Sequence, residues 1–138
     1  MPTTIQRHSI ALPGRANDPD FHLSTLQAGA GPAVVLVHGF PDLALGWHNQ
    51  LPVLAEAGFH AIAPDMRGYG GSSCPHPVDA YSIDELSGDL VALLDALEIE
   101  KAVFVGHDWG GFVVWGMAAL HPERVAGVVA ACTPYIPF

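Results

Sequence analysis

The sequence has little positive charge: five Lys and Arg stand against fourteen Asp and Glu among 138 residues, for a formal net charge of -9. Such a chain would repel phosphate backbones and anionic lipid headgroups, so nucleic acid and membrane surfaces are poor candidate partners. It also has no apolar run of the about 18 residues that span a bilayer, and residues 1–14 lack the apolar region of a secretory signal. These absences predict an untargeted protein of the cytoplasm.

Cysteine is equally scarce, and neither a metal nor a nucleotide cofactor has a recognisable motif. Cys74 and Cys132 lie far apart, and two such cysteines without a secretory leader favour free thiols. None of the eight histidines has a partner at the three- or four-residue spacing that places two imidazoles on one helix face. Gly68, Gly70 and Gly71 lack the third spacing of a dinucleotide-binding motif, and no phosphate-loop lysine accompanies them. We therefore expect no metal and no cofactor.

Half of the residues are hydrophobic, which is enough to bury a core in one domain or in a piece of a larger one. Apolar runs alternate with helical patterns from Ala33 onward, without internal repeats, and this alternation predicts a largely parallel sheet. Four short runs, rich in Val, Ile and Ala and bounded by Gly or Pro, are interpreted as buried parallel strands. They are residues 33–38, 59–64, 101–106 and 125–132.

Two segments between these runs carry the pattern of helices. Apolar residues at helical spacing predict a helix over residues 82–97, where Ser82 and Glu85 form a capping-box pattern. Residues 110–120 are apolar nearly all round and stop before Pro122, which predicts a buried helix. Both helices are expected to pack on the sheet.

An opening hairpin completes the predicted architecture. Residues 5–12 and 21–28 flank the turn-rich segment 13–20, which suits two antiparallel strands. Together the elements predict an α/β domain over residues 1–138, with helices on both faces of a mostly parallel sheet. The ligand site of such a sheet lies in the crevice at the carboxyl ends of the strands. The polar or turn residues expected there are His38, Asp65, Asp108 and Pro134.

The segment Gly106-His107-Asp108-Trp109-Gly110 falls where a predicted strand meets a predicted helix. Small residues two before and two after the central residue permit an unusually sharp turn, which is the layout of a nucleophile elbow with Asp in place of Ser. On this interpretation Asp108 is the catalytic nucleophile, while Gly106, His107 and Gly110 support the turn. The alternative is that Asp108 only caps the following helix, which Asp does well.

The loop His38-Gly39-Phe40-Pro41 directly follows the first predicted parallel strand. In an elbow-type site, one oxyanion donor comes from such an early loop and the other from the residue after the nucleophile. Here these donors would be the backbone amides of Phe40 and Trp109, with His38, Gly39 and Pro41 supporting the loop. The alternative is an ordinary Gly-Pro turn that ends a strand.

The segment from Asp65 to Ser72, DMRGYGGS, follows another predicted strand. Its glycines allow tight backbone turns, and Asp65 and Arg67 can pair with each other or bond backbone groups. We interpret this segment as structural.

Taken in this order and spacing, HGFP, DMRGYGGSS, GHDWGG and HPERV resemble the α/β-hydrolase superfamily, and specifically its epoxide hydrolases. The resemblance covers most of the chain from about Ala33 onward, and residues 133–137 are similar to the stretch through which that family enters its cap. It implies the N-terminal portion of the α/β-hydrolase fold, ending after the sixth strand. The family's general-base histidine, its acid partner and its cap tyrosines would follow residue 138. His38 and His107 are interpreted as structural, not as that base.

Aspartate as the nucleophile suits displacement at a saturated carbon. Attack on an ester would give a mixed anhydride, whereas attack on an epoxide or an alkyl halide gives an ordinary alkyl ester that water can hydrolyse. Hydrolysis passes through an oxyanion that the Phe40 and Trp109 amides would stabilise. We therefore expect an epoxide and water as the reactants and a diol as the product.

Two other functions are compatible with the same residues. A haloalkane dehalogenase-type hydrolase would use the same nucleophile, but relatives of that type usually carry Asn or Glu where Phe40 stands, and haloacetate dehalogenases carry Arg where Trp109 stands. A catalytically inactive, truncated binding domain would explain the missing base but not the intact elbow. By itself, the 138-residue chain is expected to turn over nothing and to leave residues 125–132 as an open apolar edge strand.

Overall fold

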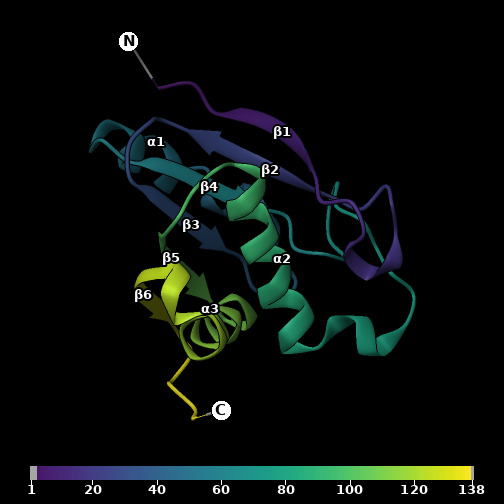
Figure 1. The fold of residues 1–138 in the computed structure, drawn as a ribbon. Coiled ribbons are helices and arrows are strands. Elements are labelled where there is room, and N and C mark those ends of the chain that lie inside the picture. Colours follow the sequence, from purple (N-terminus) through teal and green to yellow (C-terminus); the bar gives the residue numbers. More distant parts are fainter. Residues whose placement is uncertain (1–2, 138) are drawn as a thin grey trace.

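A computed structural model describes residues 3–137, whose strands form one six-stranded sheet in the order β1-β2-β4-β3-β5-β6 (Figure 1). The strands are β1 (Gln6–Ala11), β2 (His22–Ala28), β3 (Ala33–Val37), β4 (His60–Pro64), β5 (Ala102–His107) and β6 (Val125–Ala131). The α-helices of this part of the chain are α1 (Gln50–Glu56), α2 (Ile83–Ala96) and α3 (Trp109–Leu120). Short 3-10 turns lie at Arg15–Asn17, Ala44–Trp47, Val78–Tyr81 and Pro122–Arg124.

The predicted antiparallel opening and the predicted parallel run are both confirmed. β1 pairs antiparallel with β2, with Ser9 opposite Ser24, and β2 in turn pairs antiparallel with β4. β3 pairs in parallel with β4 and with β5, and β5 pairs in parallel with β6. Because these four strands run in one direction, their carboxyl ends open on the same edge of the sheet.

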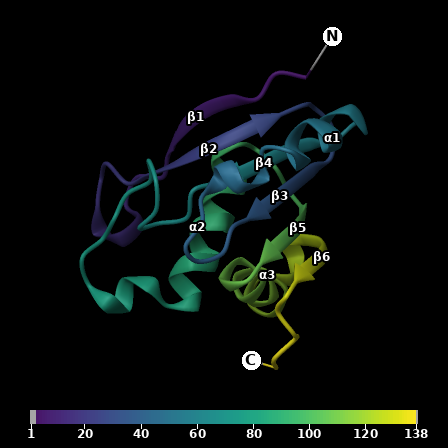
Figure 2. The same ribbon diagram turned by 180° about the vertical axis from the view of Figure 1, so that it is seen from behind.

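Helices cover both faces of the sheet, as the sequence predicts. Side chains alternate across a strand, so the apolar strand β3 supplies both faces. Val34 and Leu36 pack with Leu51 of α1, whereas Val35 and Val37 belong to the core formed with α2 and α3. Figures 1 and 2 show α1 on the opposite side of the sheet from α2 and α3.

β6 lies at the edge of the described sheet, where Val129 is 55% exposed, in agreement with the open apolar edge expected of residues 125–132 in this chain by itself. Two details differ from the expectations. Helix α1 was not predicted, because it is short and carries Pro52 in its first turn. The capping box is half formed: the Ser82 hydroxyl accepts the Glu85 N–H at 3.3 Å, but the Ser82 N–H donates to the carbonyl of Asp79.

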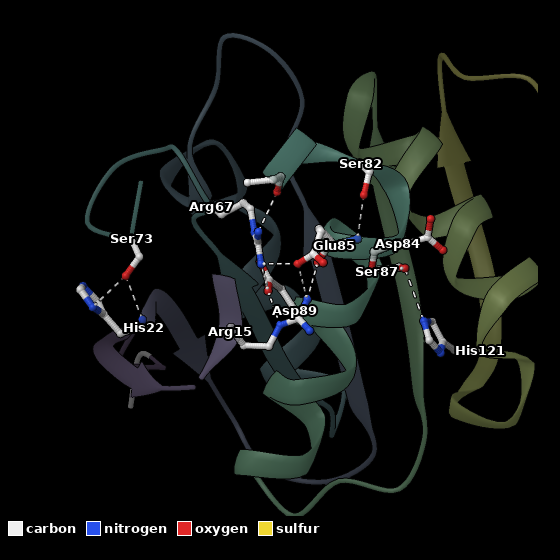
Figure 3. Close-up of polar contacts among 11 residues, drawn as sticks. Arg15, His22, Arg67, Ser73, Ser82, Asp84, Glu85, Ser87, Asp89 and His121 are labelled. Atoms are coloured by element: carbon white, nitrogen blue, oxygen red, sulfur yellow. Dashed lines mark hydrogen bonds and ion pairs between the residues drawn. The ribbon is translucent and has the colours of Figure 1, made fainter. Parts of the chain in front are cut away.

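A buried ion pair fixes the segment after β4 against α2. Arg67 donates through Nε and Nη2 to the two carboxylate oxygens of Asp89 at 2.6 and 2.5 Å, and both side chains are fully buried. Arg15 donates to the same carboxylate at 2.9 Å and to Glu85 at 3.2 Å (Figure 3). Arg67 therefore pairs with Asp89 and not with Asp65, whose carboxylate instead accepts backbone N–H groups.

Candidate active site

Asp108 lies on a sharp turn between the end of β5 and the start of α3. Its φ of 56° and ψ of -123° are sparsely populated for a residue with a side chain, and such a conformation costs on the order of 1–3 kcal/mol. A Cβ at Gly106 would overlap the carbonyl oxygen of Gly110, and a Cβ at Gly110 would overlap that of Val37. Close backbone packing, which glycine alone permits, therefore holds the turn that the sequence pattern predicts.

The carboxylate of Asp108 faces the two amides that sequence reasoning paired with it. The N–H of Phe40 donates to Oδ2 at 3.0 Å. Hydrogen bonds from the backbone amides of Phe40 and then Trp109 hold the pKa of Asp108 below its ordinary value, and nearby His107 acts in the same direction. Burial opposes these effects without outweighing them. The site thus stabilises negative charge at this position.

The capping alternative accounts for the position of Asp108 but not for the direction of its carboxylate. Asp108 occupies the N-cap of α3, yet its side chain makes no capping hydrogen bond, which would come from the N–H of the second or third residue of that helix. The backbone carbonyl of Asp108 instead accepts the N–H of Gly111 at 3.0 Å and the hydroxyl of Thr133 at 2.6 Å. The carboxylate is left to face the loop after β3.

The loop from His38 to Pro41 presents its backbone to Asp108 and its later side chains to the surface. Gly39 is buried, and a Cβ added there would lie 2.5 Å from the Cβ of Asp108. Phe40 is 63% exposed and Pro41 is also exposed, and the peptide bond between them is cis. A side chain at Gly39 would therefore push the Phe40 amide away from the nucleophile.

The two histidines interpreted as structural have different surroundings. His38 is 3% exposed; its Nδ1 lies 2.9 Å from the carbonyl oxygen of Gly39, and its Nε2 lies 3.0 Å from the N–H of Met66. His107 is exposed. Within residues 3–137, neither imidazole is hydrogen-bonded to the Asp108 carboxylate.

Two spaces adjoin the elbow. An open cleft of about 360 Å³ lies beside Asp108, between the first turn of α3 and the segment after β6. Its other lining residues are Trp109, Phe112, Cys132, Thr133, Pro134 and Ile136. A smaller cavity of about 180 Å³ lies behind Gly39 and Trp109, with Tyr69 and Val113 among its walls. Most of these linings are apolar, which suits a small uncharged ligand.

Sequence reasoning missed two residues next to the elbow. The ring of Tyr69 lies edge-on to that of His38, with 4.7 Å between centroids, and burial followed by the charge of Asp108 raises the pKa of its phenol. Thr133 holds the backbone carbonyl of Asp108. Both lie in turn-rich segments, where no local pattern indicated a contact with the elbow.

The described residues also bear on other classes of site. Across residues 3–137, no helix is long and apolar enough to cross a membrane. In the same range, no three His, Cys, Asp or Glu side chains gather as ligands for a metal ion. Cys74 and Cys132 are both free and exposed, as the sequence predicts.

An acidic elbow after β5, an amide-bearing loop after β3 and a mostly parallel sheet define an α/β-hydrolase. The family model of the alpha/beta hydrolase fold matches residues 32–137, and the chain belongs to this family.

Several relatives that resemble this chain strongly are named epoxide hydrolases. It is 53% identical over 117 residues to epoxide hydrolase A of Mycobacterium tuberculosis, a match that covers 83% of this chain and 36% of that protein. It is 48% identical over 119 residues to bifunctional epoxide hydrolase 2 of Sus scrofa, covering 86% of this chain and 21% of the relative. The chain thus spans about a third or less of the length of these relatives.

Solved structures give the same picture. The crystal structure of epoxide hydrolase A from Mycobacterium thermoresistibile superposes with a TM-score of 0.85 at 46% identity, covering 97% of this chain and 41% of that one. Epoxide hydrolase VrEH1 from Vigna radiata gives a TM-score of 0.87 at 34% identity, covering 96% of this chain and 42% of that one. The fold is therefore that of the N-terminal portion of these enzymes.

Proposed function

We propose that this chain supplies the nucleophile and the oxyanion hole of an epoxide hydrolase. The observation that carries the proposal is the Asp108 carboxylate, which lies on a strained elbow with Oδ2 against the Phe40 N–H and borders an open cleft. An aspartate in that place suits attack on a saturated carbon. Relatives between 46% and 53% identical bear the name epoxide hydrolase, which supports this chemistry over other uses of the elbow.

In the first step, a carboxylate oxygen of Asp108 attacks one carbon of the epoxide ring. An ester C–O bond forms while the ring C–O bond breaks, and the epoxide oxygen takes up a proton from an acid that the family carries in its cap. Because the Phe40 and Trp109 amides depress the pKa of Asp108, the nucleophile is ionised at neutral pH.

In the second step, water attacks the carbonyl carbon of the Asp108 ester. The tetrahedral oxyanion forms beside the amides of Phe40 and Trp109, the bond from the carbonyl carbon to the alkyl oxygen breaks, and the diol leaves. Asp108 returns as a carboxylate that holds one oxygen from water. The water proton goes to a base that we assign, with the family, to a histidine outside residues 1–138.

The side chains at the site favour an uncharged substrate over one that carries a carboxylate. Phe40 and Trp109 are both more than half exposed and apolar, so they offer surface to an uncharged substituent and no cation to a carboxylate. The reactants are thus a small epoxide and water, and the reaction needs no cofactor. The two free, exposed thiols persist best in a reducing compartment, so we place this activity in the cytoplasm.

A single turnover in heavy-oxygen water tests this proposal, with full-length protein in excess over a small aryl or alkyl epoxide. The first diol is expected to carry ordinary oxygen, while the peptide containing Asp108 gains the heavy isotope. Heavy oxygen in the diol and none in Asp108 would indicate direct attack by water. Halide release from a chloroalkane at a rate comparable to diol formation would favour a dehalogenase, and the absence of both reactions would favour a binding domain.

A further inference from the structure

The hydrogen bonds of His38 select one tautomer of its buried ring. Nε2 lies 3.0 Å from the backbone N–H of Met66, which can only donate, so Nε2 must be the acceptor. Nδ1 lies 2.9 Å from the carbonyl oxygen of Gly39, which can only accept, so Nδ1 must carry the proton. These contacts are compatible with the neutral Nδ1–H ring alone, because the other tautomer would lose both bonds and a doubly protonated ring would lose one.

The carbonyl that His38 binds belongs to the same peptide group as the amide that faces the nucleophile. In the planar trans peptide between Gly39 and Phe40, the C=O and N–H groups point in opposite directions, so fixing one fixes the other. The Gly39 carbonyl accepts hydrogen bonds from His38 Nδ1 and from the Asp42 N–H at 3.0 Å. On the other side, the Phe40 N–H donates to Asp108 Oδ2 at 3.0 Å.

The ring of His38 is itself held from a second strand. Met66 is the second residue after the end of β4, and its N–H donates to Nε2 of His38. The Tyr69 ring packs edge-on against the imidazole at 4.7 Å between centroids. A continuous set of contacts thus runs from the end of β4 through His38 to the Gly39–Phe40 peptide and on to Asp108 after β5.

We propose that His38 is a positioning residue for ester hydrolysis, the second half of the proposed reaction. Through the Gly39 carbonyl it aims the Phe40 N–H at the oxyanion that forms on Asp108, without touching the substrate. The inference rests on the proposed function. During alkylation, negative charge leaves the Asp108 oxygen, whereas during hydrolysis it develops there, so a misaligned amide impairs hydrolysis more than ester formation.

Two substitutions separate the bonds of His38. His38→Asn places an amide near the position of Nδ1 and can still donate to the Gly39 carbonyl. His38→Gln places its amide near the position of Nε2 and loses that donor. His48→Gln is the matched control, because His48 lies in the same stretch and its Nδ1 bonds the Leu45 carbonyl at 3.0 Å, but its ring is exposed.

The full-length protein is assayed by quenched single turnovers and by the mass of the peptide that contains Asp108. We expect His38→Gln to accumulate the alkyl ester and to lower kcat by about 10- to 100-fold, somewhat less than removal of a whole oxyanion donor. KM should fall in parallel, because slower hydrolysis lets the ester build up, so kcat/KM changes little. His38→Asn should keep kcat within about 10-fold of the wild type, and His48→Gln should match the wild type.

A His38→Gln variant with wild-type kcat, or with reduced kcat/KM and no accumulated ester, would overturn the inference. A second measurement needs no variant: nitrogen NMR of histidine-labelled wild type should find the His38 ring protonated at Nδ1 and unprotonated at Nε2. The reverse tautomer would also overturn it. If the wild type forms neither ester nor diol, the proposed function fails, and the role of His38 in the reaction fails with it. The NMR measurement of the His38 tautomer does not depend on that activity.

Discussion

Asp108 occupies a position where a capping aspartate and a nucleophilic aspartate look alike in sequence. A cap would accept a hydrogen bond from the N–H of the second or third residue of α3. The observed side chain makes no such bond and instead accepts from Phe40, 68 residues earlier in the chain. The positive φ of Asp108 carries a strain that helix capping does not offset, and strain of this kind clusters at functional positions.

Substitution of the nucleophile tests this residue directly. Asp108→Asn keeps an oxygen for the Phe40 N–H but removes the ionised nucleophile, so diol formation by the full-length protein should fall by roughly 10⁴- to 10⁶-fold. The unfolding midpoint should change little, because no capping bond is lost. Asp79→Asn, at an exposed residue, serves as the control and should keep full activity. An active Asp108→Asn variant with lowered stability would instead favour the capping role.

At the scale of the elements, ion pairs with α2 hold the segment after β4 in place. Arg67 leaves that segment and meets Asp89 of α2 in a fully buried pair, while Arg15 ties the opening hairpin to the same carboxylate. The Arg67 guanidinium also lies over the ring of Phe21, at 4.9 Å from its centroid. Burial disfavours the charged form of Arg67, but Asp89 more than compensates, so the pKa of Arg67 is raised.

Breaking this pair should be costly, since removal of one partner leaves a buried charge. Arg67→Met is expected to lower the free energy of unfolding by about 3 to 5 kcal/mol, toward the lower end because Arg15 still binds Asp89. The double variant Arg67→Met, Asp89→Leu should recover part of the loss. Arg7→Met, at a half-exposed arginine, should cost at most about 1 kcal/mol. Denaturant unfolding measures all three, and equal losses in Arg67→Met and Arg7→Met would contradict the expectation.

A second element-scale prediction concerns pH and strand β4. His60 binds the side-chain oxygen of Gln27 at 2.8 Å, and burial, followed by the charge of His8, lowers the pKa of His60. Below pH about 6.5 the unfolded chain therefore takes up a proton that the folded chain resists, so stability falls as pH decreases through the folded pKa. His60→Gln should lose less stability between pH 7 and pH 5 than the wild type does.

Urea midpoints at the two pH values measure this difference. The exposed His48 provides the control, because His48→Gln should keep the wild-type dependence on pH. Parallel losses in the wild type and in His60→Gln would assign the acid sensitivity to other groups.

At the scale of the whole molecule, the described sheet ends in an exposed, apolar edge strand, β6. β1 and β6 form the two edges of the described sheet, and no residue of β6 is fully buried, in contrast to the fully buried strand β3. The apolar residues Val129, Tyr135 and Ile136 are each more than half exposed in and after that strand. An exposed apolar edge is a template for pairing with another chain.

A polypeptide of residues 1–138 should accordingly self-associate, bind a hydrophobic dye and exchange the amides of β6 rapidly. It should also form no diol, because within residues 3–137 no imidazole is bonded to Asp108, and a general base contributes roughly 10² to 10⁴ in rate. Val129→Lys should reduce the association, since charge on an edge opposes pairing. A monomeric, dye-silent polypeptide with a sharp two-state melt, or one that produces diol, would contradict this prediction.

Local patterns in the sequence were sufficient to predict most of the strands and helices and the sharp turn at Asp108. Strand periodicity, the stop before Pro122 and the glycines around Asp108 depend on interactions between near neighbours, and the boundaries agree to within one residue for α2 and α3. The same locality explains why α1 was not predicted, because a seven-residue helix carries too few periodic positions to be recognised.

Tertiary structure alone decided which groups meet. The Phe40 amide reaches Asp108 because the carboxyl ends of β3 and β5 lie at the same edge of the sheet. Arg67 pairs with Asp89 and not with Asp65 because α2, which carries Asp89, packs beside the segment after β4. The single tautomer of His38 likewise depends on the N–H of Met66, 28 residues later. Propensities act along the chain, whereas these contacts are fixed by strand order and register, which no short stretch of residues contains.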